Sequence, residues 1–280
     1  MGASEMGAMK TVLITGCSSG IGRATATAFL NDDWTVYATA RDTDDVAALA
    51  DAGCETAPLD VTVDDDVRGV VARVVDEQGR IDCLVNNAGT AQLGPLEDVP
   101  VDALHDQFDA NVYGPHRLTR AVLPHMRARE SGTIVNVSSA NGRVCIPGTG
   151  AYGGSKFALE AMSDALRGEV GEYGIDVVLV EPGPVATQFD ERVDDTFDRL
   201  DRSGAYDRVY RFHEDRALVG RQNPVASPPE AVAQVILEAG VSPDPDPRYT
   251  VGAVGWLSRI GRLLPDRLRD AGFRAVASLL

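Results

Sequence analysis

The chain has 280 residues, of which 44% are hydrophobic, and 42 acidic residues against 26 basic ones give it a net charge of −16 at pH 7. This length suits one α/β domain, and the acidity argues against nucleic acid as a partner. The sequence has no apolar run long enough to span a membrane, and residues 1–9 have no cationic region leading into an apolar core. We therefore expect a cytoplasmic protein with a disordered tail over residues 1–9.

The acidity has two explanations. Acidic runs such as Asp64-Asp65-Asp66 look like a solvated shell, and the chain has only two lysines, Lys10 and Lys156. A halophilic source explains both, because high salt screens the repulsion between carboxylates. The alternative is a GC-rich genome, which also replaces lysine by arginine.

The cysteines and histidines show no metal-binding pattern. Cys17, Cys54, Cys83 and Cys145 are scattered, and no C-x-x-C pair or zinc-like spacing to a histidine occurs. We expect reduced thiols and no metal. Cys17 lies in a glycine-rich turn, where it is either a small filler or an accessible thiol.

Seven strand-like runs alternate with about six helical stretches along the chain. Such alternation predicts a parallel sheet with right-handed crossovers and helices on both faces. The predicted strands are Thr11 to Thr15, Thr35 to Thr39, Glu55 to Leu59, Ile81 to Val85, Thr133 to Val137, Val177 to Val180 and Tyr249 to Val251.

A glycine-rich turn follows the first predicted strand. Its glycines, Gly16, Gly20 and Gly22, are spaced one residue wider than the G-x-G-x-x-G fingerprint and precede a helical stretch. Glycines here let the backbone approach a pyrophosphate at a helix N-terminus, although glycines alone also fit a tight turn. Two other strands end in Asn86-Asn87-Ala88-Gly89 and in Ser138-Ser139, so three strand ends converge on one cleft.

Tyr152 and Lys156 are four residues apart in a predicted helix, which places both side chains on one face. An ammonium beside a phenol favours the phenolate and so lowers the phenol pKa toward the range useful for acid–base catalysis. Alone, this spacing is also typical of a solvated helix face. The neighbouring motifs decide between the two interpretations.

In this order the motifs resemble those of the short-chain dehydrogenase/reductase family, over roughly residues 10 to 190. The matching positions are Thr15-Gly16-x3-Gly20-Ile21-Gly22, Asn86-Asn87-Ala88-Gly89, Asn111, Ser139, Tyr152-x3-Lys156 and Pro182-Gly183. The resemblance implies a single-domain Rossmann fold over residues 10–254, with a mostly parallel, doubly wound seven-stranded sheet in the order 3-2-1-4-5-6-7.

The resemblance also implies four catalytic roles. Tyr152 exchanges a proton with the substrate oxygen, and Lys156 lowers the phenol pKa and holds the nicotinamide ribose. Ser139, thirteen residues before the tyrosine, orients the substrate oxygen. Asn111 holds a water that links Lys156 to solvent.

Cofactor choice depends on the end of the second strand. By the family pattern, Ala40 stands where an NAD-selecting aspartate would be, and Arg41 follows, whose guanidinium can bind a 2′-phosphate. This favours NADP(H), with NAD(H) possible because Asp42 can pair with Arg41 or bind a ribose. The further cofactor-binding residues that the resemblance implies are Gly16, Ser18, Ser19, Gly20, Ile21, Gly22, Asp60, Val61, Asn87, Ala88, Gly89, Tyr152, Lys156, Pro182, Gly183, Val185 and Thr187.

Two further segments bear on the substrate. Residues 184–229 hold several aromatic residues and resemble the substrate lid of the family. Residues 255–280 are amphipathic, with Trp256 and leucines among arginines, and we expect them to pack over the substrate cleft. Contact with a membrane surface or a partner is the alternative.

Within the family the chain resembles the subgroup of 17β-hydroxysteroid dehydrogenase type 1 and the retinol dehydrogenases. The resemblance lies in residues 11–20, Tyr37-Ala-Thr with Arg41-Asp42, Ser155-Lys-Phe-Ala-Leu-Glu160 and Gln222-Asn-Pro224. We therefore expect an NAD(P)-dependent oxidoreductase that interconverts a hydrophobic secondary alcohol and its ketone, as a homodimer or homotetramer. The alternative is a non-catalytic NADP-binding sensor or scaffold.

Overall fold

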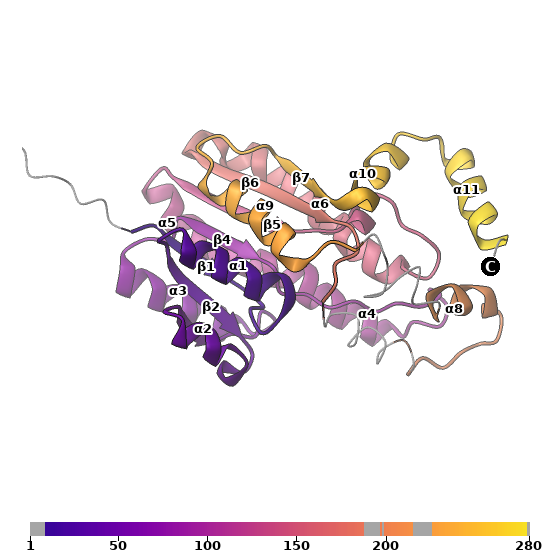
Figure 1. Ribbon diagram of the computed structural model, residues 1–280, viewed down its shortest axis with the longest axis horizontal. Coiled ribbons are helices and arrows are strands. Elements are labelled where there is room, and N and C mark those ends of the chain that lie inside the picture. Colours follow the sequence, from indigo (N-terminus) through magenta and orange to yellow (C-terminus); the bar gives the residue numbers. More distant parts are fainter. Residues whose placement is uncertain (1–8, 188–196, 198, 215–225, 279–280) are drawn as a thin grey trace, which may run out of the picture.

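The computed structural model describes residues 9–187, 197, 199–214 and 226–278, and Figure 1 shows their arrangement. Seven strands form one sheet in the order β3-β2-β1-β4-β5-β6-β7, and every neighbouring pair is parallel. The expected strand order is confirmed, and the sheet is wholly rather than mostly parallel. The strands are β1 (Thr11–Ile14), β2 (Thr35–Ala40), β3 (Glu55–Pro58), β4 (Cys83–Asn86), β5 (Gly132–Val137), β6 (Ile175–Pro182) and β7 (Arg248–Val251).

Helices cover both faces of the sheet, and each face has its own apolar core. On one face lie α1 (Gly20–Asn31), α2 (Ala47–Asp51) and α9 (Pro229–Val241), whose buried side chains pack on alternate strand residues such as Val12. The opposite face carries α3 (Asp64–Gln78), α5 (Gly114–Ala128) and α6 (Gly150–Val170), packed on the intervening residues such as Leu13. Alternation of side chains along each strand thus supplies both cores.

The remaining helices gather beyond the carboxyl ends of the strands (Figure 1). They are α4 (Val101–Phe108), which runs through the π-helical turn η2 (Asp109–Tyr113) into α5, then α8 (Asp207–Glu214), α10 (Gly252–Gly261) and α11 (Asp266–Ser278). Pro265 separates α10 from α11, because proline cannot continue a helix. The described residues therefore contain more helices than the six expected, mainly because short connections and the C-terminal region are helical.

The sheet reverses its direction of growth beside β1. β1 pairs with β2 on one side and with β4 on the other, so the connections after β1 and β4 leave in opposite directions. In an open parallel sheet, a ligand binds outside the carboxyl ends of the strands at such a switch point. The glycine-rich turn follows β1 and Asn87 follows β4, so both predicted motifs lie at this point.

A buried carboxylate secures the opposite, amino-terminal edge of the sheet. Asp82 Oδ2 accepts hydrogen bonds from the backbone N–H of Thr11 at 2.8 Å and from Arg80 Nε at 2.6 Å. Arg129 Nη2 donates to the other oxygen at 3.0 Å. Burial raises the pKa of Asp82, but these hydrogen bonds outweigh it and hold the pKa below its usual value. Lys10 is exposed at this same edge, directly before β1.

The expected tail and part of the expected lid fall on residues that the structure does not describe. The tail over residues 1–8 and residues 188–196 and 215–225 of the expected lid lie outside the described residues. Within the described chain, no helix has the length and apolar character needed to cross a bilayer. Across the same ranges, no three His, Cys, Asp or Glu side chains are grouped as a metal site.

Candidate active site

Three glycines shape the turn after β1 and the start of α1. Gly16 and Gly20 have φ angles of 72° and 54°, in the left-handed region that glycine adopts without strain. A Cβ on Gly22 would overlap the carbonyl oxygen of Gly16 and lie 2.5 Å from Asn87 Nδ2. Position 22 therefore needs a glycine to let α1 begin this close to the turn.

Thr15 joins this turn to the segment after β4. Its Oγ1 accepts hydrogen bonds from the backbone N–H groups of Asn87, at 3.0 Å, and Ala88, at 2.9 Å. Asn87 Nδ2 in turn donates to the backbone oxygens of Thr15, at 2.9 Å, and Gly16, at 3.1 Å. The two predicted motifs are thus held together by reciprocal bonds.

The N-terminus of α1 fits a phosphate group. Ser19 is its N-cap but makes no side-chain capping bond, and the first turn contains no acidic residue. The first N–H groups of a helix and its dipole attract anions, so a dinucleotide pyrophosphate fits this end. Cys17 in the same turn is fully buried, and burial raises its pKa to about 12, which makes it the inert filler of the two alternatives.

Arg41 follows β2 on the surface, next to an aspartate that already has a partner. Asp42 Oδ1 accepts the backbone N–H of Asp44 at 3.0 Å and caps the short helix η1 (Thr43–Val46). Burial raises the pKa of Asp60, but hydrogen bonds from Thr62 and the nearby charge of Arg41 leave it below its usual value. Arg41 and Asp60 therefore approach each other across the ends of β2 and β3.

Arg23 is a second cation in this region, which the sequence analysis did not identify. Arg23 Nη2 donates to the backbone oxygen of Asp45 at 2.9 Å and also to that of Ser18. The guanidinium thus connects the glycine turn to η1. Its place one residue after Gly22 was visible in the sequence, but nothing there indicated which way its side chain points.

Ser139 and Tyr152 face each other, as predicted. Ser139 caps the short helix η3 (Ala140–Gly142) through a 3.1 Å bond from the backbone N–H of Asn141, and it also hydrogen-bonds the Tyr152 phenol. Burial raises the pKa of that phenol, and the bond from Ser139 offsets part of the rise. Ser138 instead points toward Gly142, where an added Cβ would lie 2.7 Å from its Oγ.

Lys156 is placed differently from the expectation that it lowers the phenol pKa. Its Nζ donates to the carbonyl oxygen of Val137 at 2.9 Å and lies 5.8 Å from the centroid of the Tyr152 ring. Burial lowers the pKa of Lys156 to about 8, with the charge of Glu160 acting in the other direction. Desolvation, rather than the ammonium, thus governs the phenol in this arrangement, and its pKa is raised.

Asn111 uses its side chain to connect three segments. Asn111 Nδ2 donates to the backbone oxygen of Thr90 at 2.8 Å and to Ser155 Oγ at 3.0 Å, while Oδ1 accepts the Thr90 N–H at 2.8 Å. Both amide hydrogens are therefore engaged. The residue fixes η2 against α6 and against the segment after β4.

The segment after β6 closes over the glycine turn. Val185 pairs with Ser227 in an isolated parallel bridge, and Gly183 N donates to the oxygen of Val251 at 2.9 Å. A Cβ on Gly20 would lie 2.9 Å from the Thr187 methyl group. The structure therefore brings Thr187 and the glycine turn together, although they are far apart in the sequence.

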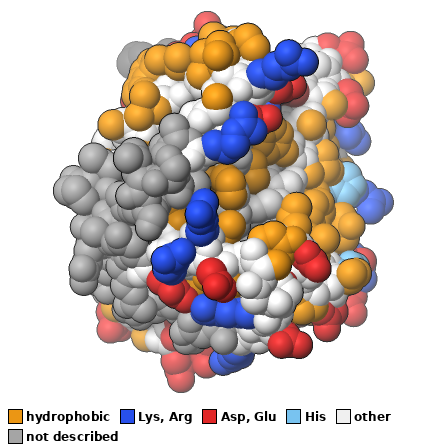
Figure 2. All heavy atoms as spheres, turned by 90° about the vertical axis from the view of Figure 1, so that its right-hand side faces the viewer, with side chains coloured by type: hydrophobic (Ala, Val, Ile, Leu, Met, Phe, Trp, Pro, Cys, Tyr) orange, Lys and Arg blue, Asp and Glu red, His pale blue; other side chains and the backbone are white. Residues whose placement is uncertain are grey.

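Helices α10 and α8 border the site from the C-terminal side. A Cβ on Gly261 would lie 3.2 Å from Val144, which follows η3, and the Arg262 guanidinium lies 5.8 Å from the centroid of the Phe157 ring. Figure 2 shows hydrophobic side chains interspersed with basic ones across this side of the molecule. The exposed apolar residues here are Trp256, Leu257, Ile260, Leu263, Leu264 and Leu268.

The described part of the segment expected to form a lid has a small aromatic core. Phe197 and Tyr210 are buried against each other with ring centroids 5.2 Å apart, and Tyr210 Oη donates to Asp98 Oδ2 at 2.7 Å. His213 on the same helix bonds the oxygen of Pro147, just before Tyr152 in the chain, at 2.9 Å. Phe189 and Gln222-Asn-Pro224 lie outside the described residues.

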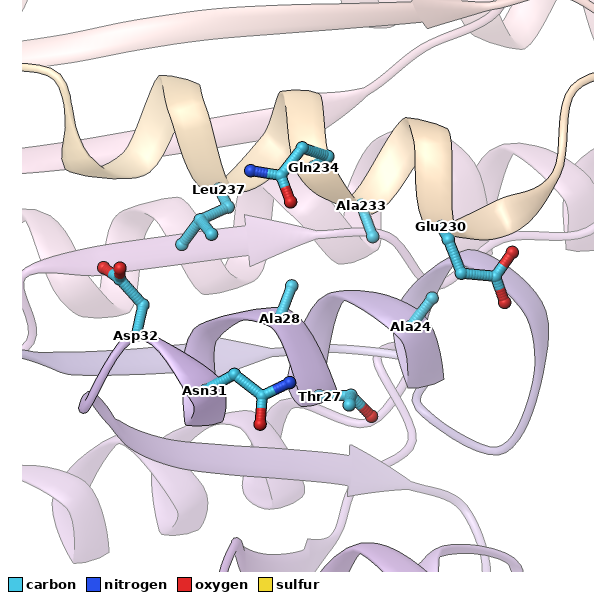
Figure 3. Close-up of a pocket in the computed structure, with 9 residues that line it drawn as sticks. All are labelled: Ala24, Thr27, Ala28, Asn31, Asp32, Glu230, Ala233, Gln234 and Leu237. Carbon is cyan, nitrogen blue, oxygen red and sulfur yellow. The ribbon is translucent and has the colours of Figure 1, made fainter.

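A surface hollow of about 290 Å³ lies elsewhere, between α1 and α9. Figure 3 shows that small side chains from both helices, such as Ala28 and Ala233, face each other there. It runs along the helices rather than at the strand ends, and none of the predicted site residues lines it. We attribute it to imperfect closure of a helix pair.

A glycine turn at the switch point, with a serine after β5 and a tyrosine and lysine on α6, defines a dinucleotide-binding oxidoreductase of the Rossmann class. The family model described as short chain dehydrogenase matches residues 10–197. The chain belongs to this family.

Named relatives agree with this assignment. The uncharacterized oxidoreductase YbbO of Escherichia coli is 38% identical over 267 residues, which cover 93% of each chain. Human 17-beta-hydroxysteroid dehydrogenase type 1 is 38% identical over 258 residues, covering 86% of this chain and 77% of the relative. The resemblance to that subgroup is confirmed.

Solved structures have the same fold. A short-chain dehydrogenase from Streptomyces avermitilis superimposes with a TM-score of 0.81 at 35% identity, covering 97% of this chain and 98% of the other. A serine dehydrogenase described as the closed form complexed with NADP+ gives a TM-score of 0.75 at 29% identity, covering 87% of this chain and 95% of the other.

Proposed function

We propose that this protein is an NADP(H)-dependent oxidoreductase that interconverts a hydrophobic secondary alcohol and its ketone. The observation that carries the proposal is the hydrogen bond between Ser139 and the Tyr152 phenol, with Lys156 one helical turn away. A substrate oxygen placed between the serine and the tyrosine would meet one hydrogen-bond donor and one proton donor.

The chain's own residues then have distinct tasks. When bound, the nicotinamide supplies the hydride. Ser139 holds the substrate oxygen and Tyr152 donates its proton to that oxygen during reduction, or accepts it during oxidation. Lys156 is buried beside the tyrosine, so its ammonium favours the phenolate once it turns toward the ring, and it can restore the proton.

The glycine turn and the N-terminus of α1 are suited to the pyrophosphate, and Arg41 with Arg23 to a 2′-phosphate. Asp42 is engaged by the Asp44 N–H, which supports the phosphate-binding alternative over ribose binding by Asp42. The serine dehydrogenase complex with NADP+ is consistent with this choice.

An apolar substrate fits the surroundings of Tyr152. Exposed hydrophobic side chains on α10, such as Leu257 and Ile260, lie in the region where Gly261 meets the loop after η3. We propose that residues 255–280 form part of the substrate entrance and residues 184–229 its lid, with residues 10–254 as the dehydrogenase domain. The likeness to 17-beta-hydroxysteroid dehydrogenase type 1 supports a bulky apolar skeleton.

The remaining expectations are part of the same proposal. Exposed apolar residues on η2 and α6, Tyr113 and Met162, support pairing of two copies into a homodimer or homotetramer in the cytoplasm. The acidic surface supports a halophilic source.

Incubation of the purified protein with NADPH and a panel of ketones of increasing apolar size tests the proposal. We expect loss of the 340 nm absorbance of NADPH with one or more bulky ketones. A sensor or scaffold would bind NADPH and never consume it, and consumption of NADH alone would contradict the cofactor assignment.

A further inference from the structure

A buried acid continues the face of α6 that carries Tyr152 and Lys156. Glu160 lies four residues after Lys156 and eight after Tyr152, so the three side chains follow one another along one face of the helix. Its exposed fraction is 3%. A carboxylate this deeply buried needs charged partners to remain ionised.

Two arginines supply these partners and a second acid shares them, and we call the four residues the Glu160 cluster: Glu160, Glu181, Arg143 and Arg248. Burial and the charge of Glu181 raise the pKa of Glu160, and the two arginines act in the other direction. Arg248 Nε donates to Glu160 Oε2 at 3.2 Å, and Arg143 Nε lies 3.8 Å from the same oxygen. Glu181 Oε1 accepts from Arg143 Nε at 2.7 Å and lies 3.3 Å from Arg248 Nε. Two carboxylates thus face two guanidinium groups, and Arg248 also pairs with Asp164.

The cluster joins the segments that carry Ser139, Tyr152 and Pro182. Arg143 follows η3, which Ser139 caps, and Glu160 belongs to the helix of Tyr152. Glu181 directly precedes Pro182 in β6, and Arg248 begins β7. Charged contacts between buried groups depend strongly on distance, so the cluster fixes these segments relative to one another.

The two acids of the cluster are not equivalent. Both oxygens of Glu181 are engaged, because Thr250 Oγ1 donates to Oε2 at 3.2 Å. Glu160 Oε1 is buried and makes no close hydrogen bond within the described chain, although the Ser138 hydroxyl lies near enough to lower the pKa of this carboxyl. A Cβ on Gly142 would lie 3.2 Å from Glu160 Cγ and 3.4 Å from Lys156 Cβ, so both side chains border the same glycine. The less compensated carboxylate is therefore the one beside Lys156.

We propose that Glu160 is a positioning residue that keeps the buried Lys156 ammonium protonated, while Arg143 and Arg248 hold its carboxylate in place. The proposal deepens the proposed function and rests on it for its catalytic meaning, since Lys156 acts beside Tyr152 there. Whether Glu160 controls Lys156 is a property of the folded chain and can be measured without turnover.

The charges around Lys156 define the expected direction. Tyr152 and Glu160 flank it on α6, and it bonds the uncharged carbonyl of Val137 on β5. Arg143 and Arg248 contact Glu160, the charge of Glu181 acts on Glu160, and Asp164 pairs with Arg248, so these groups influence Lys156 through Glu160. Burial lowers the pKa of Lys156 to about 8, and Glu160 opposes that effect. Removal of the carboxylate would therefore lower the pKa further, because a buried ammonium loses its nearest opposite charge.

The composition of the chain allows a direct measurement. Lys10 and Lys156 are the only lysines, so protein labelled with ¹³C at lysine Cε gives two signals in an NMR pH titration. Lys10→Arg assigns them, and exposed Lys10 serves as the internal reference. We expect Glu160→Gln to lower the Lys156 pKa by about half to one unit, with the Lys10 titration unchanged.

Two variants control for general damage to the cluster. Glu181→Gln removes an equally buried charge from the same cluster, but one whose two oxygens are engaged, so a smaller shift is expected. Arg248→Gln removes one of the two guanidinium groups that keep Glu160 ionised, so it should also lower the Lys156 pKa, but by less than Glu160→Gln because Arg143 remains. If Glu160 only packed the helix and its charge did not act on Lys156, neither variant would shift that pKa.

Each result decides the proposal. An unchanged Lys156 pKa in folded Glu160→Gln, or an equal shift in Glu181→Gln, overturns it. If circular dichroism shows that Glu160→Gln does not fold, Arg248→Gln decides instead: a downward shift of the Lys156 pKa supports the proposal, and no shift or an upward one refutes it. Absence of turnover in the wild-type protein would refute the proposed function and leave the titration result standing.

Discussion

The Ser139 hydroxyl and the Tyr152 phenol share a hydrogen bond between the end of β5 and the first turn of α6. The bond holds together two side chains whose residues are thirteen positions apart in the sequence. In the function proposed above, both act on one substrate oxygen and the tyrosine releases the proton.

Tyr152→Phe should reduce kcat by about 10²- to 10⁴-fold, because it removes the proton that moves and little else. NADPH affinity, measured by fluorescence titration, should stay within about twofold of the wild type. A variant that retains more than about a tenth of wild-type kcat would show that another group is the acid.

Arg41→Ala should raise KM for NADPH by about 10- to 100-fold and leave KM for NADH nearly unchanged, since a charge-assisted contact to the 2′-phosphate is lost. Arg68→Ala is the matched control. It also removes an exposed arginine, this one on α3, and should leave KM unchanged for both cofactors. Equal effects of Arg41→Ala on both cofactors, or a wild type that prefers NADH, would refute the NADP assignment.

Salt should stabilise the protein. With a net charge of −16, the carboxylates repel one another, and at about 1 M KCl the screening length is only about 3 Å. Thermal melts should therefore show a midpoint that rises steadily up to molar KCl. A flat or falling midpoint would leave the acidity as a matter of genome composition.

Asp82→Asn should lower the free energy of unfolding at pH 7 by about 2 to 4 kcal/mol, because Arg80 and Arg129 then lack their buried partner. The folded pKa of Asp82 is lowered, so its contribution is complete above the unfolded value of about 3.9 and is lost as pH falls through the folded pKa. Urea melts at pH 7 and below pH 4 should show the difference from the wild type shrinking in acid. A constant difference would contradict the ion-pair explanation.

Ile260→Ser tests the substrate entrance. The side chain is 59% exposed and adjoins Gly261, which packs on Val144, so KM for a bulky apolar ketone should rise about three- to tenfold while KM for a small ketone stays the same. Val63→Ser changes an apolar residue of similar exposure, 43%, away from the site and should have no effect. Co-sedimentation of the wild type with anionic lipid vesicles, lost in Ile260→Ser, would instead favour the membrane-surface alternative.

Strands and their order were predictable because β1, β2, β4, β5 and β6 are buried along nearly their whole length and read as apolar runs, whereas the edge strands β3 and β7 are partly exposed. The predictions differ from the structure at the ends of the strands. β4 was expected at Ile81 to Val85 but spans Cys83–Asn86, although the Asp82 backbone still bonds Thr11 and Thr133 of the neighbouring strands. β6 extends to Pro182, beyond the expected Val180, since it pairs with β7 to its end.

The identities of the site residues were predictable from spacing, but their electrostatics were not. Spacing placed Tyr152 and Lys156 on one face, yet it could not show that the ammonium bonds Val137 and that burial raises the phenol pKa. The arginine partners of Glu160 come from residues 17 positions before it and 88 positions after it, and only the folded chain brings them together. Glu160 ends the motif Ser155-Lys-Phe-Ala-Leu-Glu160, but its position in the motif indicated no role for it.

The position of Lys10 determines how the protein can be attached to a support. Amine-reactive coupling finds Lys10 exposed before β1, whereas Lys156 is 6% exposed and lies inside the molecule. A surface activated for amines would thus hold the protein by the amino-terminal edge of its sheet, with the opposite edge and its cleft facing the solution.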